Sequence, residues 1–141
     1  MDSAPLVPVL SSMAAIQQAL AEETERLVAL RFSSDPAAVD CVFMDEILAR
    51  SAARVRRFAV VYGVDLRQVP QAARRFGVEA WRPLSLQFYY RKRLIKVDCG
   101  TGDTARLTRP VPSVQQVVDL FEVVYRQALR GKGLAMAPFR L

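Results

Sequence analysis

The sequence predicts a single α/β domain in which helices cover a mixed sheet. The chain has 141 residues, which suits one domain, and 52% of them are apolar, which is enough for a core. Segments with a helical period alternate with short apolar runs, and no linker, repeat or low-complexity tract interrupts them. We therefore expect one domain over residues 1–141, with extended ends at 1–10 and 131–141.

The first half of the chain predicts two helices and two strands. A helix is expected near 13–21, and the apolar run 27–32 (LVALRF) is typical of a buried strand. A longer helix is expected at about 41–57. Its buried side is predicted to include Phe43, Ile47, Leu48 and Val55. The segment 58–64 (FAVVYGV) is apolar on both faces, which favours the centre of a sheet covered on both sides.

The second half predicts a short helix, a hairpin and a final helix. The short helix spans about 71–76, where Pro70 precedes it and Gly77 closes it. Strands are expected at 84–90 and 94–99, joined by a charged tight turn. The last helix begins near Ser113, which forms a capping box with Gln116, and it ends before Gly131.

The order of these elements is that of a thioredoxin-type fold. It runs helix, strand, helix, strand, helix, strand, strand, helix. The first two strands are joined by a crossover helix, so they should be parallel with a right-handed connection. The last two should pair as an antiparallel hairpin. The fold class predicted is therefore thioredoxin-like α/β, with a central four-stranded mixed sheet flanked by helices.

The residue types present exclude several kinds of chemistry. Histidine is absent, so the chain has no Ser-His-Asp triad, Cys-His pair or histidine-liganded metal. The two cysteines, Cys41 and Cys99, are 58 residues apart, which excludes a CxxC motif and a four-cysteine zinc site. No stretch approaches the roughly 18 apolar residues that span a membrane. We expect no metal, no cofactor and no small-molecule substrate.

A thioredoxin-type fold places its chemistry at the start of the helix after the first central strand. A thiol pair there lies at the positive end of the helix dipole, opposite a cis-proline. In this chain Cys41 stands at the second cysteine position, and Ala38 stands where the attacking cysteine should be. Alanine cannot supply a thiolate, so Cys41 is a vestigial thiol position. Pro83, just before the third central strand, is the cis-proline candidate.

Charge is unevenly distributed along the chain. Residues 1–49 carry eight acids and two bases, a net of −6, whereas residues 50–141 carry six acids and 18 bases, a net of +12. A basic half is typical of contact with nucleic acid or with an acidic protein surface. The alternative is that the arginines only solvate exposed faces, and composition alone does not separate the two.

Seven residues are candidates for contact with a partner or with RNA. The hairpin turn Arg91-Lys92-Arg93 is flanked by Tyr89 and Tyr90, of which we expect at most one to be exposed. Cations beside an aromatic ring suit phosphate contact and base stacking, and the alternative is a solvated turn. Trp81 is either an exposed anchor or a cover over the Pro83 loop. The remaining candidates are Arg106, Arg109 and Lys132.

Five stretches of the sequence resemble one known family. They are RF at 31–32, CVFMDEIL at 41–48, RFAVVYGVDLRQVP at 57–70, FYYRKRLIKVDCGTG at 88–102 and VVDLFEVVYRQALRGKGLAMAP at 117–138. Together they resemble the Dim-type thioredoxin-like family of the spliceosomal U-five particle and tri-snRNP, from about Pro8 to Pro138. Some members carry a second cysteine just after the cis-proline, where this chain has Leu84, so the resemblance implies no disulfide for Cys41.

This resemblance implies a non-catalytic structural component of the spliceosomal tri-snRNP that acts in pre-mRNA splicing in the nucleus. The implied partners are the large central scaffold protein and the bridging repeat protein, with the backbone of pre-mRNA or snRNA as an option. No enzyme activity and no membrane are implied. Two alternatives from other classes stay open, a thiol-disulfide oxidoreductase-like protein and a free-standing RNA-binding protein.

Overall fold

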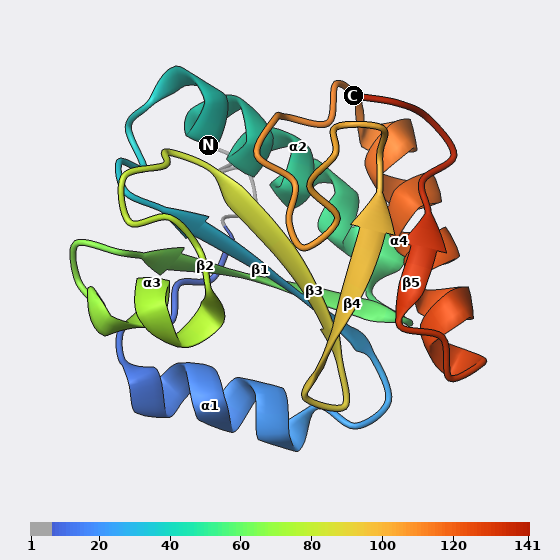
Figure 1. The fold of residues 1–141 in the computed structure, drawn as a ribbon, viewed down its shortest axis with the longest axis horizontal. Coiled ribbons are helices and arrows are strands. Elements are labelled where there is room, and N and C mark those ends of the chain that lie inside the picture. The colour runs from blue at the N-terminus through green and yellow to red at the C-terminus, as the bar shows by residue number, and fades with distance from the viewer. Residues whose placement is uncertain (1–6) are drawn as a thin grey trace, which may run out of the picture.

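A five-stranded mixed sheet forms the centre of the structure, a computed structural model that describes residues 7–141 (Figure 1). The strand order is β2-β1-β3-β4-β5. The strands are β1 (Leu27–Ser33), β2 (Ala59–Asp65), β3 (Ser85–Tyr90), β4 (Arg93–Asp98) and β5 (Leu134–Met136). As predicted, β1 and β2 are parallel and β3 and β4 form an antiparallel hairpin.

Four helices cover the two faces of this sheet. They are α1 (Met13–Glu22), α2 (Val39–Val55), α3 (Gln71–Phe76) and α4 (Val114–Leu129). Buried residues of α2 and α4, such as Leu48 and Phe121, share a core with Leu27 of β1. On the other face, Ile16 of α1 and Ala72 of α3 share a smaller core with Val28. Within residues 7–141, no helix is long and apolar enough to cross a membrane.

Local sequence signals set most of the helix ends. Ser12 and Ser113 are the N-caps of α1 and α4, and each hydroxyl accepts a hydrogen bond from the backbone N–H three residues later. Gly77 ends α3 in the left-handed conformation, with φ of 67°, which a residue without a Cβ adopts without strain. These signals act through near neighbours, so the predicted helices agree closely with the observed ones.

The prediction that the FAVVYGV strand lies at the sheet centre is wrong. This segment forms β2, which is the first strand in the sheet order, and β1 is the more central of the two. The outer edge of β2 is covered by the chain before α1. The Gly63 N–H donates to the Pro8 carbonyl at 2.7 Å and the Leu10 N–H donates to the Gly63 carbonyl at 2.9 Å. This cover explains an apolar strand at that position, since its edge is not left open.

The sheet has five strands, whereas the sequence predicts four. The fifth, β5, lies in the expected extended end 131–141 and pairs parallel with β4, Val97 opposite Ala135. A strand of three residues shows too little alternation to be recognised from sequence. Of the other expected end, 1–10, the first six residues lie outside the described part of the chain.

The buried side of α2 also differs from the prediction. Cys41, Met44, Leu48 and Val55 are buried, but Phe43 is exposed and Ile47 is only half-buried. The helix faces both the sheet and α4, which turns Cys41 and Met44 inward and leaves Phe43 outside. The amino end of α2 therefore carries an apolar side chain on the surface.

Candidate functional site

Cys41 lies in the first turn of α2 and is fully buried. Its Sγ atom is 4.0 Å from Oδ2 of Asp45, one helical turn further along. Burial is the largest cause that raises the pKa of the Cys41 thiol, and the charges of Asp45 and Asp35 act in the same direction. The N-cap of α2 is Ala38, which has no side-chain hydrogen bond. The position of a thioredoxin nucleophile is thus occupied by a methyl group, with a protonated, inaccessible thiol behind it.

The Asp45 carboxylate is held by a buried arginine from β1. Arg31 Nε donates to Oδ1 at 2.8 Å and Nη2 donates to Oδ2 at 2.9 Å, and Arg31 is only 4% exposed. A Cβ on Gly63 of the neighbouring strand would lie 2.6 Å from Nη2, so glycine gives the guanidinium its space. Because both carboxylate oxygens accept from Arg31, Asp45 is engaged in a bidentate pair rather than poised to take a proton from the thiol.

The second cysteine is buried as well. Cys99 follows β4 and is buried, and burial raises its pKa to about 11. Both cysteines are free. Within residues 7–141, no cluster of His, Cys, Asp and Glu has the geometry to hold a metal ion.

The loop before β3 is fixed to the loop that leads into α2. The Ser34 N–H donates to the Arg82 carbonyl at 2.9 Å and its hydroxyl donates to the Trp81 carbonyl at 2.8 Å. The expected cis bond before Pro83 is not found, because every peptide bond in residues 7–141 is trans. The trans form is the one that an X–Pro bond prefers.

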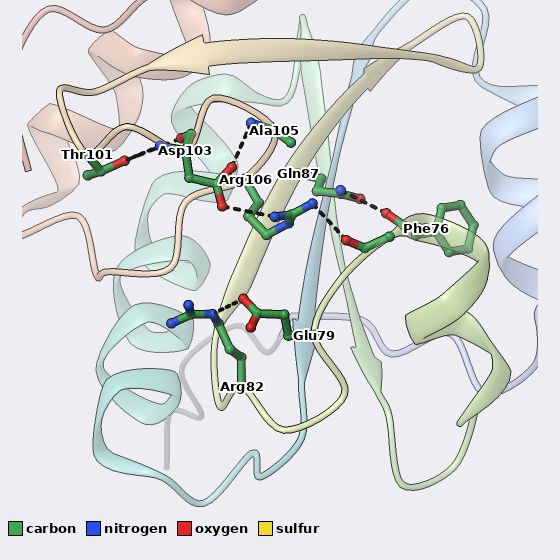
Figure 2. Close-up of polar contacts among 9 residues, drawn as sticks. Phe76, Glu79, Arg82, Gln87, Thr101, Asp103, Ala105 and Arg106 are labelled. Atoms are coloured by element: carbon green, nitrogen blue, oxygen red, sulfur yellow. Dashed lines mark hydrogen bonds and ion pairs between the residues drawn. The ribbon is translucent and has the colours of Figure 1, made fainter.

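Trp81 is exposed, as one of its two interpretations predicts. Its side chain is 65% exposed, and the Arg82 guanidinium carbon lies 4.6 Å from the ring centroid. Arg82 in turn donates from Nε to Glu79 Oε1 at 2.6 Å (Figure 2). The guanidinium is therefore held against the exposed indole.

Three apolar side chains on α2 are exposed, which was not predicted from the sequence. Val39, Val42 and Phe43 are 83%, 52% and 41% exposed, and we refer to them as the α2 surface. Their spacing of three and four residues places them on one side of the helix. The signal was present in the sequence, since the first turn of α2 has more apolar residues than one buried face can hold.

The cations of the hairpin turn are largely engaged with backbone. Arg91 Nε donates to the Thr24 carbonyl at 2.9 Å, and Arg93 Nη1 donates to the Gly131 carbonyl at 3.3 Å. Tyr89 and Tyr90 are both buried, so neither offers a ring for base stacking. The turn itself consists of Arg91 and Lys92, and Arg93 already belongs to β4.

The other cationic candidates fall into two kinds. Arg106 donates from Nη1 to Asp103 Oδ2 at 2.9 Å and from Nη2 to the Gly77 carbonyl at 2.7 Å (Figure 2). It therefore joins two loops. The side chains of Arg109 and Lys132 are exposed and make no ion pair with residues 7–141.

The structure does not gather these candidates into one site. Arg93 is bonded to the Gly131 carbonyl, and Lys132 is the next residue along the chain. Arg93 and Lys132 therefore lie at one end of β5. Arg106 and Arg109 come from the loop between β4 and α4, and Trp81 comes from the loop before β3. The α2 surface adds a further apolar region at the end of the sheet where a thioredoxin carries its thiols.

Comparison with known proteins identifies the family. A family model described as "Mitosis protein DIM1" matches residues 6–141. The chain belongs to the DIM1 family. "Mitosis protein dim1" of Schizosaccharomyces pombe is 35% identical over 132 residues, which cover 94% of this chain and 91% of the relative. "Spliceosomal protein DIB1" of Saccharomyces cerevisiae is 34% identical over 134 residues, 95% of this chain and 92% of the relative.

Solved structures confirm the thioredoxin-like fold of this DIM1-family chain. Chloroplastic thioredoxin z matches with a TM-score of 0.65 at 13% identity, over 87% of this chain and 97% of that structure. The thioredoxin of Fasciola hepatica matches with a TM-score of 0.63 at 15% identity, over 85% of this chain and 98% of that structure. At these identities the likeness concerns the fold alone.

Proposed function

We propose that this chain is a non-catalytic structural component of the pre-mRNA splicing machinery, acting in the nucleus within the tri-snRNP. The observation that carries the proposal is the amino end of α2. There Ala38 replaces the nucleophile, Cys41 is fully buried, and the apolar α2 surface is exposed. Membership of the DIM1 family supports the same role, since its relatives include proteins named as spliceosomal.

Exposed apolar side chains at this end suit a protein partner. Exposed large apolar residues that gather on one helix side mark interaction surfaces more often than scattered ones do. Tryptophan and phenylalanine are the kinds of residue that anchor interfaces, and the exposed Trp81 ring contacts the Arg82 guanidinium. We assign the α2 surface and Trp81 to one of the tri-snRNP proteins, for which the large central scaffold protein and the bridging repeat protein are the candidates.

The uneven charge supports oriented assembly. Residues 50–141 have a net charge of +12, and Arg109 and Lys132 in this part are exposed without an ion pair among residues 7–141. Unpaired surface cations attract an acidic partner or a phosphate backbone from a distance, and they set orientation and association rate more than affinity. We assign Arg109 and Lys132 this steering role.

Affinity purification of the tagged protein from nuclear extract tests the proposal. We expect the parent protein to recover the spliceosomal RNAs and their core proteins. The variant F43S/W81S should lose most of that material. The matched control L134S/M136S changes two apolar residues of β5 that are also about half exposed, so it should retain it. Purification of the parent without spliceosomal RNA or core proteins would overturn the proposal.

The non-catalytic part has its own test, which is insulin reduction with dithiothreitol. The parent and C41S should both give the background rate, because the only thiol near the thioredoxin position is buried and protonated. Turnover above background that disappears in C41S would identify the chain as an oxidoreductase instead.

A further inference from the structure

A cavity of about 360 Å³ lies between α1, α3 and the β3–β4 turn. Leu20 and Tyr89 of its lining belong to the smaller of the two cores. The helices α1 and α3 beside it lie on the side of the sheet opposite α2 (Figure 1). Its lining residues include Gln17, Leu20, Arg75, Phe76, Tyr89 and Lys92. The cavity is thus remote in the fold from the α2 surface.

The lining combines an apolar floor with two cations. Leu20, Phe76 and Tyr89 supply the floor, and Arg75 and Lys92 are the charged residues of the lining, which contains no acid. Neither cation forms an ion pair or a side-chain hydrogen bond with residues 7–141, whereas the neighbouring Arg91 is bonded to a carbonyl. Two uncompensated positive charges beside an apolar surface favour a ligand that is both anionic and apolar.

The β3–β4 turn holds Lys92 at the rim of this cavity through an unusual backbone. Arg91 and Lys92 have φ of 51° and 68°, the left-handed region that two-residue hairpin turns normally fill with asparagine and glycine. The bond from Arg91 Nε to the Thr24 carbonyl ties the turn to the chain after α1. A non-glycine pair retained in this conformation is the kind of strain that accompanies functional sites.

We propose that this cavity binds an acidic peptide segment of a partner protein. An aliphatic side chain of the peptide packs on Leu20, Phe76 and Tyr89, and carboxylates next to it pair with Arg75 and Lys92. We choose an acidic ligand because the lining has two cations and no acid. The proposal goes beyond the splicing role, since it concerns a second docking site that the purified chain would have by itself.

The floor of the cavity favours a peptide over a nucleotide. The Tyr89 hydroxyl donates to Gln87 Oε1 at 2.8 Å, and Gln87 Nε2 donates to the Phe76 carbonyl at 3.1 Å, so these groups are not free to read a base edge. The Phe76 ring contacts Phe32 and the edge of Tyr89, and the Arg75 guanidinium carbon lies 5.6 Å from its centroid. RNA recognition by stacking needs an open aromatic face, which the floor does not provide.

Proton–nitrogen correlation spectra of the purified protein test this site. The probe is a capped peptide of alternating aspartate and leucine, titrated to millimolar concentration at low salt, with an asparagine–leucine peptide as its neutral match. We expect the acidic peptide to shift the amide signals of Leu20, Ala21, Phe76 and Tyr89. The variant R75Q/K92Q should bind it about tenfold more weakly, the size expected for two exposed charge pairs.

Two controls keep the result specific. R109Q/K132Q removes the same charge from exposed cations elsewhere and should leave the affinity unchanged, and thermal unfolding checks that each variant is folded. The proposal is overturned if no amide of the cavity shifts, if the asparagine peptide binds equally well, or if R109Q/K132Q weakens binding as much as R75Q/K92Q. Stronger shifts of the same amides by oligouridine would assign the cavity to RNA instead. None of these outcomes depends on recovery of splicing components.

Discussion

Two arginines of this molecule each pair with a carboxylate and lie beside a glycine, but they contribute differently to the structure. Arg31 extends from β1 under α2 and meets Asp45 through two hydrogen bonds, next to Gly63. Arg106 divides its guanidinium between Asp103, three residues away, and the carbonyl of Gly77. Within residues 7–141, the buried side-chain nitrogens that lack a hydrogen-bond partner are Arg31 Nη1 and Arg106 Nε.

The two arginines differ in how their positive charges are compensated. Arg31 is almost fully buried, so its charge depends on the paired Asp45 carboxylate, with a smaller contribution from the charge of Asp65. Arg106 is more exposed, and its link to α3 goes to a neutral carbonyl. The first region therefore stabilises the packing of α2 on β1, whereas the second only positions a loop.

The largest expected effect is that of D45A. This variant removes the paired carboxylate of the buried Arg31 charge, a loss that typically costs about 3–5 kcal/mol, and we expect the lower end because Asp45 is partly exposed and Asp65 still acts on Arg31. Urea unfolding measures the loss. The double variant R31M/D45A removes the stranded charge and should recover part of the stability. A loss below about 1 kcal/mol in D45A would place this pair with ordinary surface ion pairs.

The two glycines should respond differently to alanine. In G63A the new Cβ meets Arg31 Nη2, which the bidentate pair holds in place, so we expect a loss of about 1–3 kcal/mol. In G77A the new Cβ makes only an ordinary contact, 4.0 Å from Arg106 Nη2, and the cost comes from the φ of 67°, about 1 kcal/mol. Unfolding of both variants decides the order. Combining G63A with R31M should relieve the clash, and failure to do so would contradict a steric cause.

The second region is tested by R106A. The variant loses two hydrogen bonds donated by a charged guanidinium, one to a carboxylate and one to a carbonyl, and should cost about 1–2 kcal/mol. The control is R109A, which removes an exposed arginine that makes no ion pair with residues 7–141 and should change stability by less than about 0.5 kcal/mol. Equal effects of the two variants would mean that the bonds of Arg106 contribute nothing net.

The comparison also shows where sequence reasoning succeeds. Ser113 as a cap, Gly77 as a helix end and the β3–β4 hairpin depend on neighbours in sequence, and the structure confirms all three. The Arg31–Asp45 pair was not predicted, because it forms only when α2 packs on β1. Phe43 was misplaced for the same reason, since contacts with α4 and the sheet decide which side of α2 is buried.

The same distinction between local and long-range contacts applies to the candidate site. The sequence suffices to predict that thiol chemistry is lost, because Ala38 replaces a required cysteine. It does not show that Arg91 and Arg93 are bonded to carbonyls, or that both Tyr89 and Tyr90 are buried. Those facts depend on segments far away in sequence, such as Thr24 and Gly131.

The smallest expected effect is a pH dependence that belongs to the first region alone. The pKa of Cys41 in the folded protein is raised by burial above its ordinary value of 9.0, so the folded state holds the thiol proton more tightly than the unfolded state does. That contribution is fully present below the unfolded pKa and is lost as pH rises from about 9 through the folded pKa.

In urea unfolding, C41A should lose less stability than the parent between about pH 8 and pH 10.5. R106A should keep the part of the slope that depends on Cys41, because Arg106 is not among the groups that shift the Cys41 pKa. Identical slopes for C41A and the parent would show that the buried thiol titrates as it does in the unfolded chain.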